Sequence, residues 1–301
     1  MGWLGAPGEE GRGSLARSRR VGGAASAESD IGTSLQTGAA HGNARNTRAG
    51  LRPVATVPRP PACDDAPVSA EERIAVVTGG NRGIGREVVR QLGQRGFSVI
   101  LGSRDPVAGE RAAAQLAREG LAVRAHRLDV TDTGTVEALA WELADRYGRL
   151  DVLVNNAAIH YDTWQRASTA DLSIVAEAWD ANLMGPWRMC LALLPLLRRG
   201  EHRRIVNVSS ESGSLAGMGA GTPAYSVTKA ALNALTRILA AELRSDGILV
   251  NAVCPGWVAT DMGGPGGRPV ADGAASVLWA VDLSDDGPTG GFFRDGQPLP
   301  W

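Results

Sequence analysis

The stretch Thr78-Gly79-Gly80-Asn81-Arg82-Gly83-Ile84-Gly85 decides the fold, because it joins an apolar run to a helical segment through a loop of glycines. Residues 74–78 before it are apolar or β-branched, as in a buried strand, and residues 85–95 have helical periodicity. The glycines at positions 79, 83 and 85 allow a tight turn and a close approach of the backbone to a bound group. The N–H groups at the start of the helix can then bind a pyrophosphate. We therefore predict a dinucleotide-binding loop, rather than an ordinary turn between a strand and a helix.

Short apolar runs alternate with helical segments from residue 73 onward. The predicted strands are residues 74–78, 98–102, 123–128, 152–155, 205–209 and 249–253. The predicted helices are residues 85–95, 107–119, 136–147, 174–197 and 224–244. Strands that alternate with helices form a parallel sheet with right-handed crossovers. We therefore expect an α/β fold over residues 73–301: a Rossmann-like, doubly wound parallel sheet with helices on both faces, in a single domain.

Residues 1–72 differ from the rest of the chain. They are rich in Gly, Ala, Ser, Pro and Arg, and they show neither strand nor helix periodicity. Such a segment buries too little apolar surface to offset its ordering entropy, so we expect a disordered or non-native N-terminal extension. It lacks the basic and apolar regions of a secretory signal. Arg17, Arg19 and Arg20 leave a transit peptide or a nucleic-acid arm as the weaker alternative.

The composition excludes several functional classes. The 31 basic residues include a single lysine, Lys229, which follows a threonine rather than the glycine that a P-loop requires. A net charge of −1 gives no overall attraction for nucleic acid or for an anionic membrane. The most apolar stretch, residues 189–197, is far shorter than the roughly 20 residues of a membrane-spanning helix. We therefore expect neither nucleic acid nor a membrane as a partner.

The cysteines and histidines give no sign of a metal site or of a disulfide framework. Cys63, Cys190 and Cys254 lie far apart and form no CxxC pair. The histidines, at positions 41, 126, 160 and 202, have no metal-ligand spacing. We therefore expect a reduced, cytoplasmic protein that binds no metal.

The end of the second predicted strand indicates which dinucleotide is bound. A carboxylate there would bind the ribose 2′-hydroxyl of NAD, whereas an arginine accommodates the 2′-phosphate of NADP. Ser103 stands where that acid is expected, and Arg104 follows it. Arg82 in the glycine loop can reach the same phosphate, so two guanidinium groups would bind one dianion. Asp105 is a competing carboxylate, and two solvated surface arginines are the alternative, but we predict NADPH.

The segment Tyr225-Ser226-Val227-Thr228-Lys229 is the strongest signal of catalysis. On a helix, residues i and i+4 share one face, so the phenol and the ammonium project to the same side. A phenol has a reference pKa of about 10, and a nearby cation favours its charged form. A compact ammonium can also hydrogen-bond a cofactor ribose, which the planar fork of arginine does poorly. We therefore predict that Tyr225 exchanges a proton and that Lys229 lowers its pKa.

The glycine loop, with the spacing TGxxxGxG, and the YxxxK segment resemble those of the short-chain dehydrogenase/reductase family. The resemblance extends over residues 73–301, and residues 287–301 look like the ending of the carbonyl-reductase branch. It implies the catalytic residues Asn182, Ser210, Tyr225 and Lys229. The serine would orient the substrate carbonyl, and the asparagine would support a proton-relay water. Ser212 is a rival for the serine's role, because fifteen residues, more than is usual, separate Ser210 from the tyrosine.

Other segments resemble those that contact the cofactor in this family. Asp129-Val130 resembles the pair at the adenine, although an aspartate in that place is also a common turn cap. Asn155-Asn156-Ala157-Ala158 resembles the family's NNAG, with alanine in place of the glycine, and residues 254–262 resemble the segment that covers the nicotinamide. Besides the glycine loop and Arg104, the resemblance implies these cofactor-binding residues: Asp129, Val130, Asn155, Ala157, Tyr225, Lys229, Pro255, Gly256, Val258 and Thr260.

The resemblance implies an NADP-dependent oxidoreductase that acts on alcohol or carbonyl groups. We expect an NADPH-dependent reductase of small-molecule ketones, aldehydes or quinones. A ketoreductase of secondary metabolism is the enzymatic alternative, and a non-catalytic NADP-sensing module is the alternative from another class. Some carbonyl reductases of this branch are monomers with a long insertion before the tyrosine. That insertion is absent here, so a homodimer is allowed.

Overall fold

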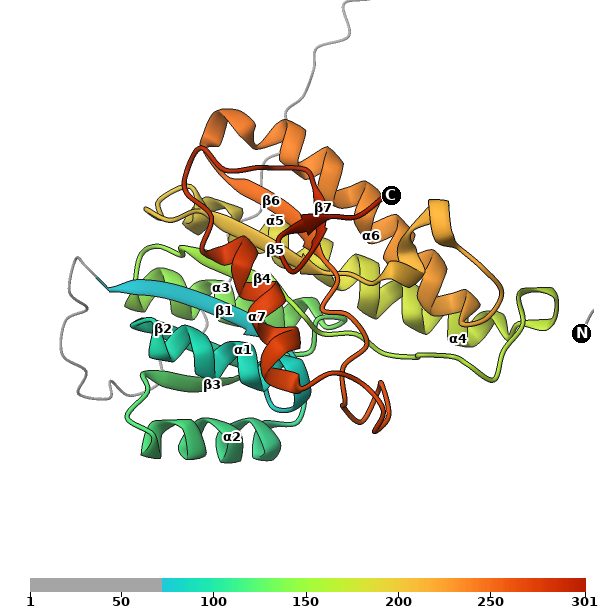
Figure 1. The fold of residues 1–301 in the computed structure, drawn as a ribbon. Helices are drawn as coiled ribbons and strands as arrows, with labels where there is room; N and C mark the ends of the chain where they lie inside the picture. The colour runs from blue at the N-terminus through green and yellow to red at the C-terminus, as the bar shows by residue number, and fades with distance from the viewer. Residues whose placement is uncertain (1–71) are drawn as a thin grey trace, which may run out of the picture. The chain divides into compact units, whose positions relative to one another are not determined.

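The computed structural model describes residues 72–301, so the expected N-terminal extension lies outside the described residues except for Glu72. An eight-stranded sheet forms the centre of this part, in the order β3-β2-β1-β4-β5-β6-β7-β8, with helices on both faces (Figure 1). Neighbouring strands are parallel except for the last pair, β7 and β8. The strands are β1 Arg73–Thr78, β2 Phe97–Ser103, β3 Val123–Arg127, β4 Val152–Asn155, β5 Arg204–Val208, β6 Leu249–Val253, β7 Phe292–Arg294 and β8 Gln297–Pro298. The doubly wound α/β fold is confirmed.

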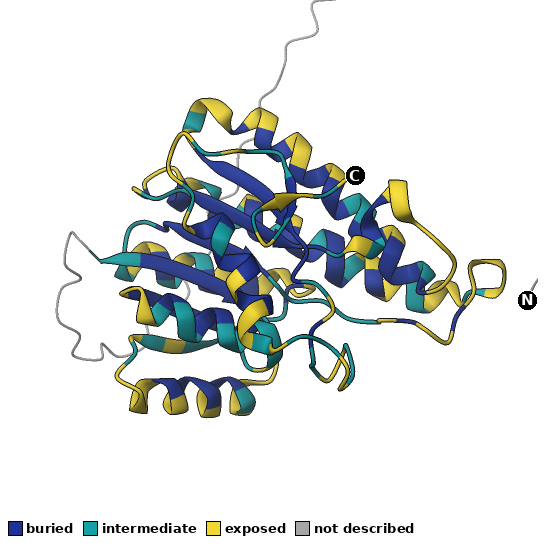
Figure 2. Cartoon of the chain, in the orientation of Figure 1, coloured by how far each residue is buried: buried dark blue, intermediate teal, exposed yellow. Residues whose placement is uncertain are grey.

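Two hydrophobic cores lie on the opposite faces of the sheet, because successive side chains of a strand point to opposite sides. In β1, Ile74 and Val76 belong to one core, while Ala75 and Val77 belong to the other. Helices α3, α5 and α6 cover the first core, and α1, α2 and α7 cover the second. Figure 2 shows the strands and the inner faces of these helices buried. The α-helices are α1 Gly83–Gln94, α2 Pro106–Arg118, α3 Thr133–Arg146, α4 Leu172–Trp179, α5 Gly185–Leu197, α6 Pro223–Glu242 and α7 Val270–Val281.

The helix predicted over residues 174–197 is interrupted. The π-helical turn η2, Asp180–Met184, separates α4 from α5, and the N–H of Gly185 bonds to the carbonyl of Asp180, five residues earlier. Pro186 follows at once and has no N–H to donate to an α-helical bond, which explains why the regular ladder fails here. Such single π turns are frequent at functional sites. This one contains Asn182.

Three further elements were not predicted from the sequence. Helix α7 packs against α1, and it buries Ala274, Val277 and Val281 in the second core. Strands β7 and β8 have three and two residues, which is too short to show a period. They extend the sheet beyond β6 and bring the end of the chain beside the loop after β5, where the N–H of Ala216 bonds to the carbonyl of Trp301. Within residues 72–301, no helix has both the length and the hydropathy needed to cross a membrane.

Candidate active site

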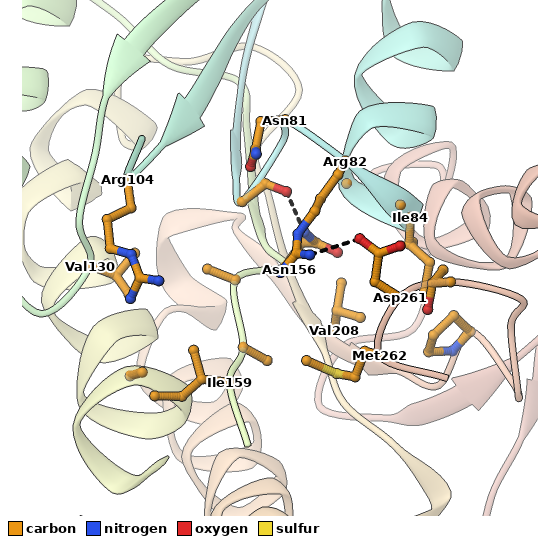
Figure 3. Close-up of a pocket in the computed structure, with 18 of the residues that line it drawn as sticks. Asn81, Arg82, Ile84, Arg104, Val130, Asn156, Ile159, Val208, Asp261 and Met262 are labelled. Carbon is orange, nitrogen blue, oxygen red and sulfur yellow. Dashed lines mark hydrogen bonds and ion pairs between the residues drawn. The ribbon is translucent and has the colours of Figure 1, made fainter. Parts of the chain in front are cut away.

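An open cavity of about 270 Å³ lies at the carboxyl ends of the strands. The chain continues from β1 to β2 and β3 on one side and returns to β4 on the other, and crevices form at such a reversal of strand order. Most of the predicted cofactor residues line this cavity: Gly79, Asn81, Arg82, Gly83, Ile84, Gly85, Arg104, Asp129, Val130, Ala157, Tyr225, Lys229, Pro255 and Thr260. Figure 3 labels five of these, namely Asn81, Arg82, Ile84, Arg104 and Val130. Together with Val208 and Ser209 at the end of β5, the lining residues come from six successive strand ends, β1 to β6.

Two positions of the glycine loop require glycine, one for its backbone conformation and one for lack of room. Gly79 has a φ of +64°, which favours glycine. A Cβ on Gly85 would collide with the carbonyl oxygen of Gly79 and with the side-chain amide of Asn156. That amide donates to the carbonyls of Thr78 and Gly79, at 2.9 and 3.2 Å, and thereby supports the loop from the end of β4. The close packing brings the backbone of the loop to the edge of the cavity.

The N-terminus of α1 is open to an anion. Arg82 occupies the N-cap position, but its side chain makes no capping hydrogen bond, and the first turn holds no acidic residue. The first N–H groups of a helix have no partner within the helix, and its dipole places partial positive charge there. These features and the glycine loop beside them fit a pyrophosphate.

The two arginines predicted to bind one phosphate have different surroundings. Arg82 forms an exposed ion pair with Asp261, with 2.7 Å between Nη1 and Oδ2 (Figure 3). Arg104 lines the cavity, and no described residue forms an ion pair with its guanidinium. The competing carboxylate, Asp105, accepts hydrogen bonds from the N–H groups of Val107 and Ala108 at the start of α2. Because Asp105 caps this helix and lies outside the cavity lining, Arg104 is the residue of this strand end that faces the site.

Three predicted cofactor residues lie outside the cavity lining: Asn155, Gly256 and Val258. The side chain of Asn155 points into the protein, where its amide donates to the side-chain oxygen of Asn207 at 2.9 Å. Val258 belongs to the loop after β6, and its side chain is buried. Asp129 does line the cavity, and one of its carboxylate oxygens also caps the turn to Thr131.

Tyr225 and Ser210 form the polar centre of the site. Tyr225 lies in the first turn of α6, nine-tenths buried. Burial raises the pKa of Tyr225 above its ordinary value of 10, and the Ser210 hydroxyl near the phenol acts in the opposite direction. The pKa is therefore raised, not lowered as we expected, because desolvation disfavours the phenolate. The rival serine, Ser212, donates its backbone N–H to Oγ of Ser210. Of the two, Ser210 is the serine that acts on the phenol.

Lys229 lies one turn beyond Tyr225 on the same face of α6, as predicted. Its Nζ lies 5.4 Å from the centroid of the Tyr225 ring and donates to the carbonyl of Val208 at 2.7 Å. Burial lowers the pKa of Lys229 from its ordinary value of 10.5 to about 8. Gly213 lets the loop after β5 approach this helix, because a Cβ there would lie 2.6 Å from the backbone carbon of Lys229.

Asn182 is close to the site but lies outside the cavity lining. Its side chain is fully buried and contacts the backbone of Ile159 twice: Oδ1 accepts from the N–H at 2.8 Å, and Nδ2 donates to the carbonyl at 3.1 Å. Nδ2 also donates to Oγ1 of Thr228 at 3.2 Å, and in the sequence Thr228 stands between Tyr225 and Lys229. Because its side-chain amide is engaged in this way, Asn182 holds the wall at Ile159 against α6.

The comparisons with known proteins agree with this geometry. The sequence model of the short chain dehydrogenase family matches residues 73–268. The chain belongs to the short-chain dehydrogenase family. The match includes every candidate residue of this short-chain dehydrogenase, from Gly79 to Thr260.

Its relatives include named reductases. A pig (Sus scrofa) protein, carbonyl reductase (NADPH) 1, is 37% identical over 282 residues, covering 78% of this chain and 96% of the relative. An Arabidopsis thaliana (+)-neomenthol dehydrogenase is 35% identical, covering 76% of this chain and 98% of the relative. A carbonyl reductase from chicken fatty liver, solved with NADPH bound, has a TM-score of 0.69 and 30% identity, and covers 76% of this chain and 99% of its own. Salutaridine reductase from Papaver somniferum has a TM-score of 0.67 and 31% identity, and covers 74% of this chain and all of its own.

Several lining residues were not predicted to bind the cofactor: Leu128, Thr131, Asn156, Ala158, Ile159, Ala181, Val208, Ser209, Asp261 and Met262. Most of them stand next to predicted cofactor residues at the ends of predicted strands. Their position at a strand end was therefore a signal in the sequence that they line the site. Ala181 lies in the π turn, and no periodicity in the sequence indicates that turn.

Proposed function

We propose that this chain is an NADPH-dependent carbonyl reductase that converts ketones, aldehydes or quinones to alcohols. The observation that carries this function is that Tyr225 and Lys229 line the cavity beside the glycine loop, while Ser210, just outside the lining, interacts with the phenol of Tyr225. Similarity to NADPH carbonyl reductases over three quarters of the chain supports it over the two alternatives, a ketoreductase of secondary metabolism and a non-catalytic NADP-sensing module.

The residues of the cavity fit a dinucleotide phosphate. The open start of α1 and the glycine loop would hold the pyrophosphate, and Arg104 would hold the 2′-phosphate. Lys229 would hold the nicotinamide ribose. When bound, NADPH supplies the hydride that a carbonyl carbon accepts.

The protein's own groups supply the proton and the orientation. Tyr225, whose raised pKa keeps its phenol protonated at neutral pH, would donate that proton to the substrate oxygen. Ser210, whose hydroxyl lies near the phenol, would orient the same oxygen. The ammonium of Lys229 would stabilise the phenolate that remains, and Asn182 would hold the cavity wall in place at Ile159.

The test is the oxidation of NADPH, followed at the nicotinamide absorbance, with a panel of ketones, aldehydes and quinones. We expect turnover by the wild-type chain and a loss of at least about 100-fold in Tyr225→Phe, which keeps the ring and removes the proton. Cofactor binding without turnover of any carbonyl would favour the sensing module. If Tyr225→Phe were as active as the wild type, Tyr225 would not be the proton donor.

We also propose that the chain resides in the cytoplasm, which fractionation of cells would test. We further propose that it forms a homodimer. Exposed apolar side chains on two long helices support the dimer: Trp187 and Leu191 on α5, and Val227 and Ile238 on α6. Exposed apolar surface of this kind often marks an interface between proteins.

A further inference from the structure

Helix α6, which carries Tyr225, has no cap of its own. Its N-cap residue, Thr222, has a φ of +42° in the left-handed region, and its hydroxyl contacts Oγ of Ser226 instead of a backbone N–H. The next residue, Pro223, has no N–H. The N–H groups of Ala224 and Tyr225 are therefore the donors that a local cap would ordinarily satisfy.

A distant carboxylate takes the place of this cap. Asp162, in the loop after β4, accepts the N–H of Ala224 on Oδ2 at 2.9 Å and the N–H of Tyr225 on Oδ1 at 3.1 Å. Its side chain is fully buried, and Gln165 donates a third hydrogen bond to Oδ2 at 3.1 Å. The positive end of the helix dipole balances the buried charge. The carboxylate thus serves both of these open donors, one with each oxygen.

The same loop contacts the ring of the tyrosine and the wall of the cavity. Tyr161 packs edge-on against Tyr225, with ring centroids 5.2 Å apart and an interplanar angle of 88°. Two residues before it, Ile159 lines the cavity and is held by Asn182. The backbone and the ring of Tyr225 are therefore both fixed relative to the segment that forms the cavity wall.

We propose that Asp162 is a positioning residue for carbonyl reduction: its carboxylate fixes the start of α6, and thereby Tyr225, against the cavity wall. This role rests on the proposed function, because it concerns the proton donor of that reaction. Asp162 binds the backbone of Tyr225, and no hydrogen bond joins its carboxylate to the phenol, so it acts through the tyrosine and takes no proton itself. A displacement of about 1 Å at a reacting group can lower a rate by about 100-fold.

Two variants of Asp162 test the proposal. Asp162→Asn keeps the shape and one oxygen acceptor, while Asp162→Ala removes both acceptors. We expect kcat to fall in the order Asp, Asn, Ala, by about 10- to 100-fold for alanine, with the affinity for NADPH and KM changed by less than about threefold. The solvent deuterium isotope effect on kcat should rise, because transfer of the proton becomes slower than the other steps.

Asp171→Ala is the matched control. Asp171 also caps a helix, α4, through the N–H of Ser173, but it is exposed and makes no contact with Tyr225. It should lose helix-capping hydrogen bonds of the same kind, yet keep kcat and the solvent isotope effect. If both substitutions lower kcat equally, Asp162 contributes only to stability, and the proposal is wrong.

Hydrogen exchange separates this proposal from the proposed function. In the protein without added NADPH, the amides of Ala224 and Tyr225 should exchange at least about 10-fold faster in Asp162→Asn than in the wild type, because they lose a charged acceptor. Unchanged exchange would show that the cap does not exist. If the wild-type chain reduces no carbonyl, the proposed function fails, but the exchange rates still show whether Asp162 caps the amides of Ala224 and Tyr225. If it is active and Asp162→Ala retains kcat, the positioning role alone is overturned.

Discussion

Lys229 is the single lysine of the chain, and it is held in a buried place where an ammonium is unfavourable. Arginine serves as the basic residue everywhere else in this sequence. We expect Lys229→Arg to lower kcat by at least about 100-fold, because a guanidinium is too large and planar for the contact with Val208 and for the ribose beyond it. NADPH oxidation measures this effect. Arg237→Lys, an exposed exchange on the same helix, should leave kcat unchanged, and near-normal activity of Lys229→Arg would contradict the role of the lysine.

The same lysine should make stability depend on pH. Its pKa is about 8 in the folded protein and near 10.5 in the unfolded chain, so between these values the unfolded state binds more protons and stability rises with pH. Below pH 8 the folded protein carries the full cost of the buried ammonium, about 3 kcal/mol. A Lys229→Met variant would avoid this cost. It would also lose the hydrogen bond to Val208, which offsets about 1 kcal/mol of the gain in stability.

Lys229→Met should therefore be more stable than the wild type at pH 7, by about 2 kcal/mol, and we expect it to be inactive. The advantage should disappear as the pH rises from 8 toward 10.5. Urea unfolding at a series of pH values measures it. A constant difference between the two proteins across this range would contradict the lowered pKa.

Arg104 should decide the choice between the two nicotinamide cofactors. Its guanidinium faces the cavity, whereas that of Arg82 is paired with Asp261. We expect Arg104→Ala to raise the KM for NADPH by about 10- to 100-fold and to leave the KM for NADH nearly unchanged, since a charged hydrogen bond contributes about 1.5–3 kcal/mol. Arg82→Ala should have the smaller effect. An unaltered preference for NADPH in Arg104→Ala would contradict the assignment.

At the scale of elements, the glycine loop depends on the end of β4. Alanine at position 85 would place a Cβ against the carbonyl of Gly79 and the amide of Asn156, and neither group can move without breaking the loop. We expect Gly85→Ala to lose NADPH binding in a fluorescence titration. Gly217→Ala, at a position with open space around it, should bind normally. Undiminished affinity in Gly85→Ala would show that the loop can widen.

The sequence predicted the elements whose periodicity is local. Strands β4 and β6 have the predicted bounds, and the other four predicted strands, β1, β2, β3 and β5, differ from theirs by no more than one residue at either end. It did not indicate the π turn at Asn182, because that turn depends on the absence of one N–H at Pro186 within an otherwise helical pattern. The cap of α6 was also missed. It joins residues that lie more than sixty positions apart, and only the packing of the loop after β4 brings them together.

At the scale of the whole molecule, the proposed homodimer depends on the outer surfaces of α5 and α6. Leu191 and Ile238 are 65% and 54% exposed. We expect the double variant Leu191→Glu/Ile238→Glu to elute as a monomer in size-exclusion chromatography with light scattering, because two charges on each copy would face apolar surface. Leu172→Glu, at a residue of α4 that is 76% exposed, should remain a dimer. A monomeric wild-type chain would contradict the dimer.

The distant cap of α6 also affects how the chain folds. A local cap forms together with its helix, but this one requires the closure of a long loop between Asp162 and Ala224. We therefore expect the first turn of α6 to become ordered late, after β4 has joined the sheet. During synthesis from the N-terminus, the ribosome releases Asp162 before the helix that needs it. The carboxylate is therefore already present when the segment that carries Tyr225 emerges.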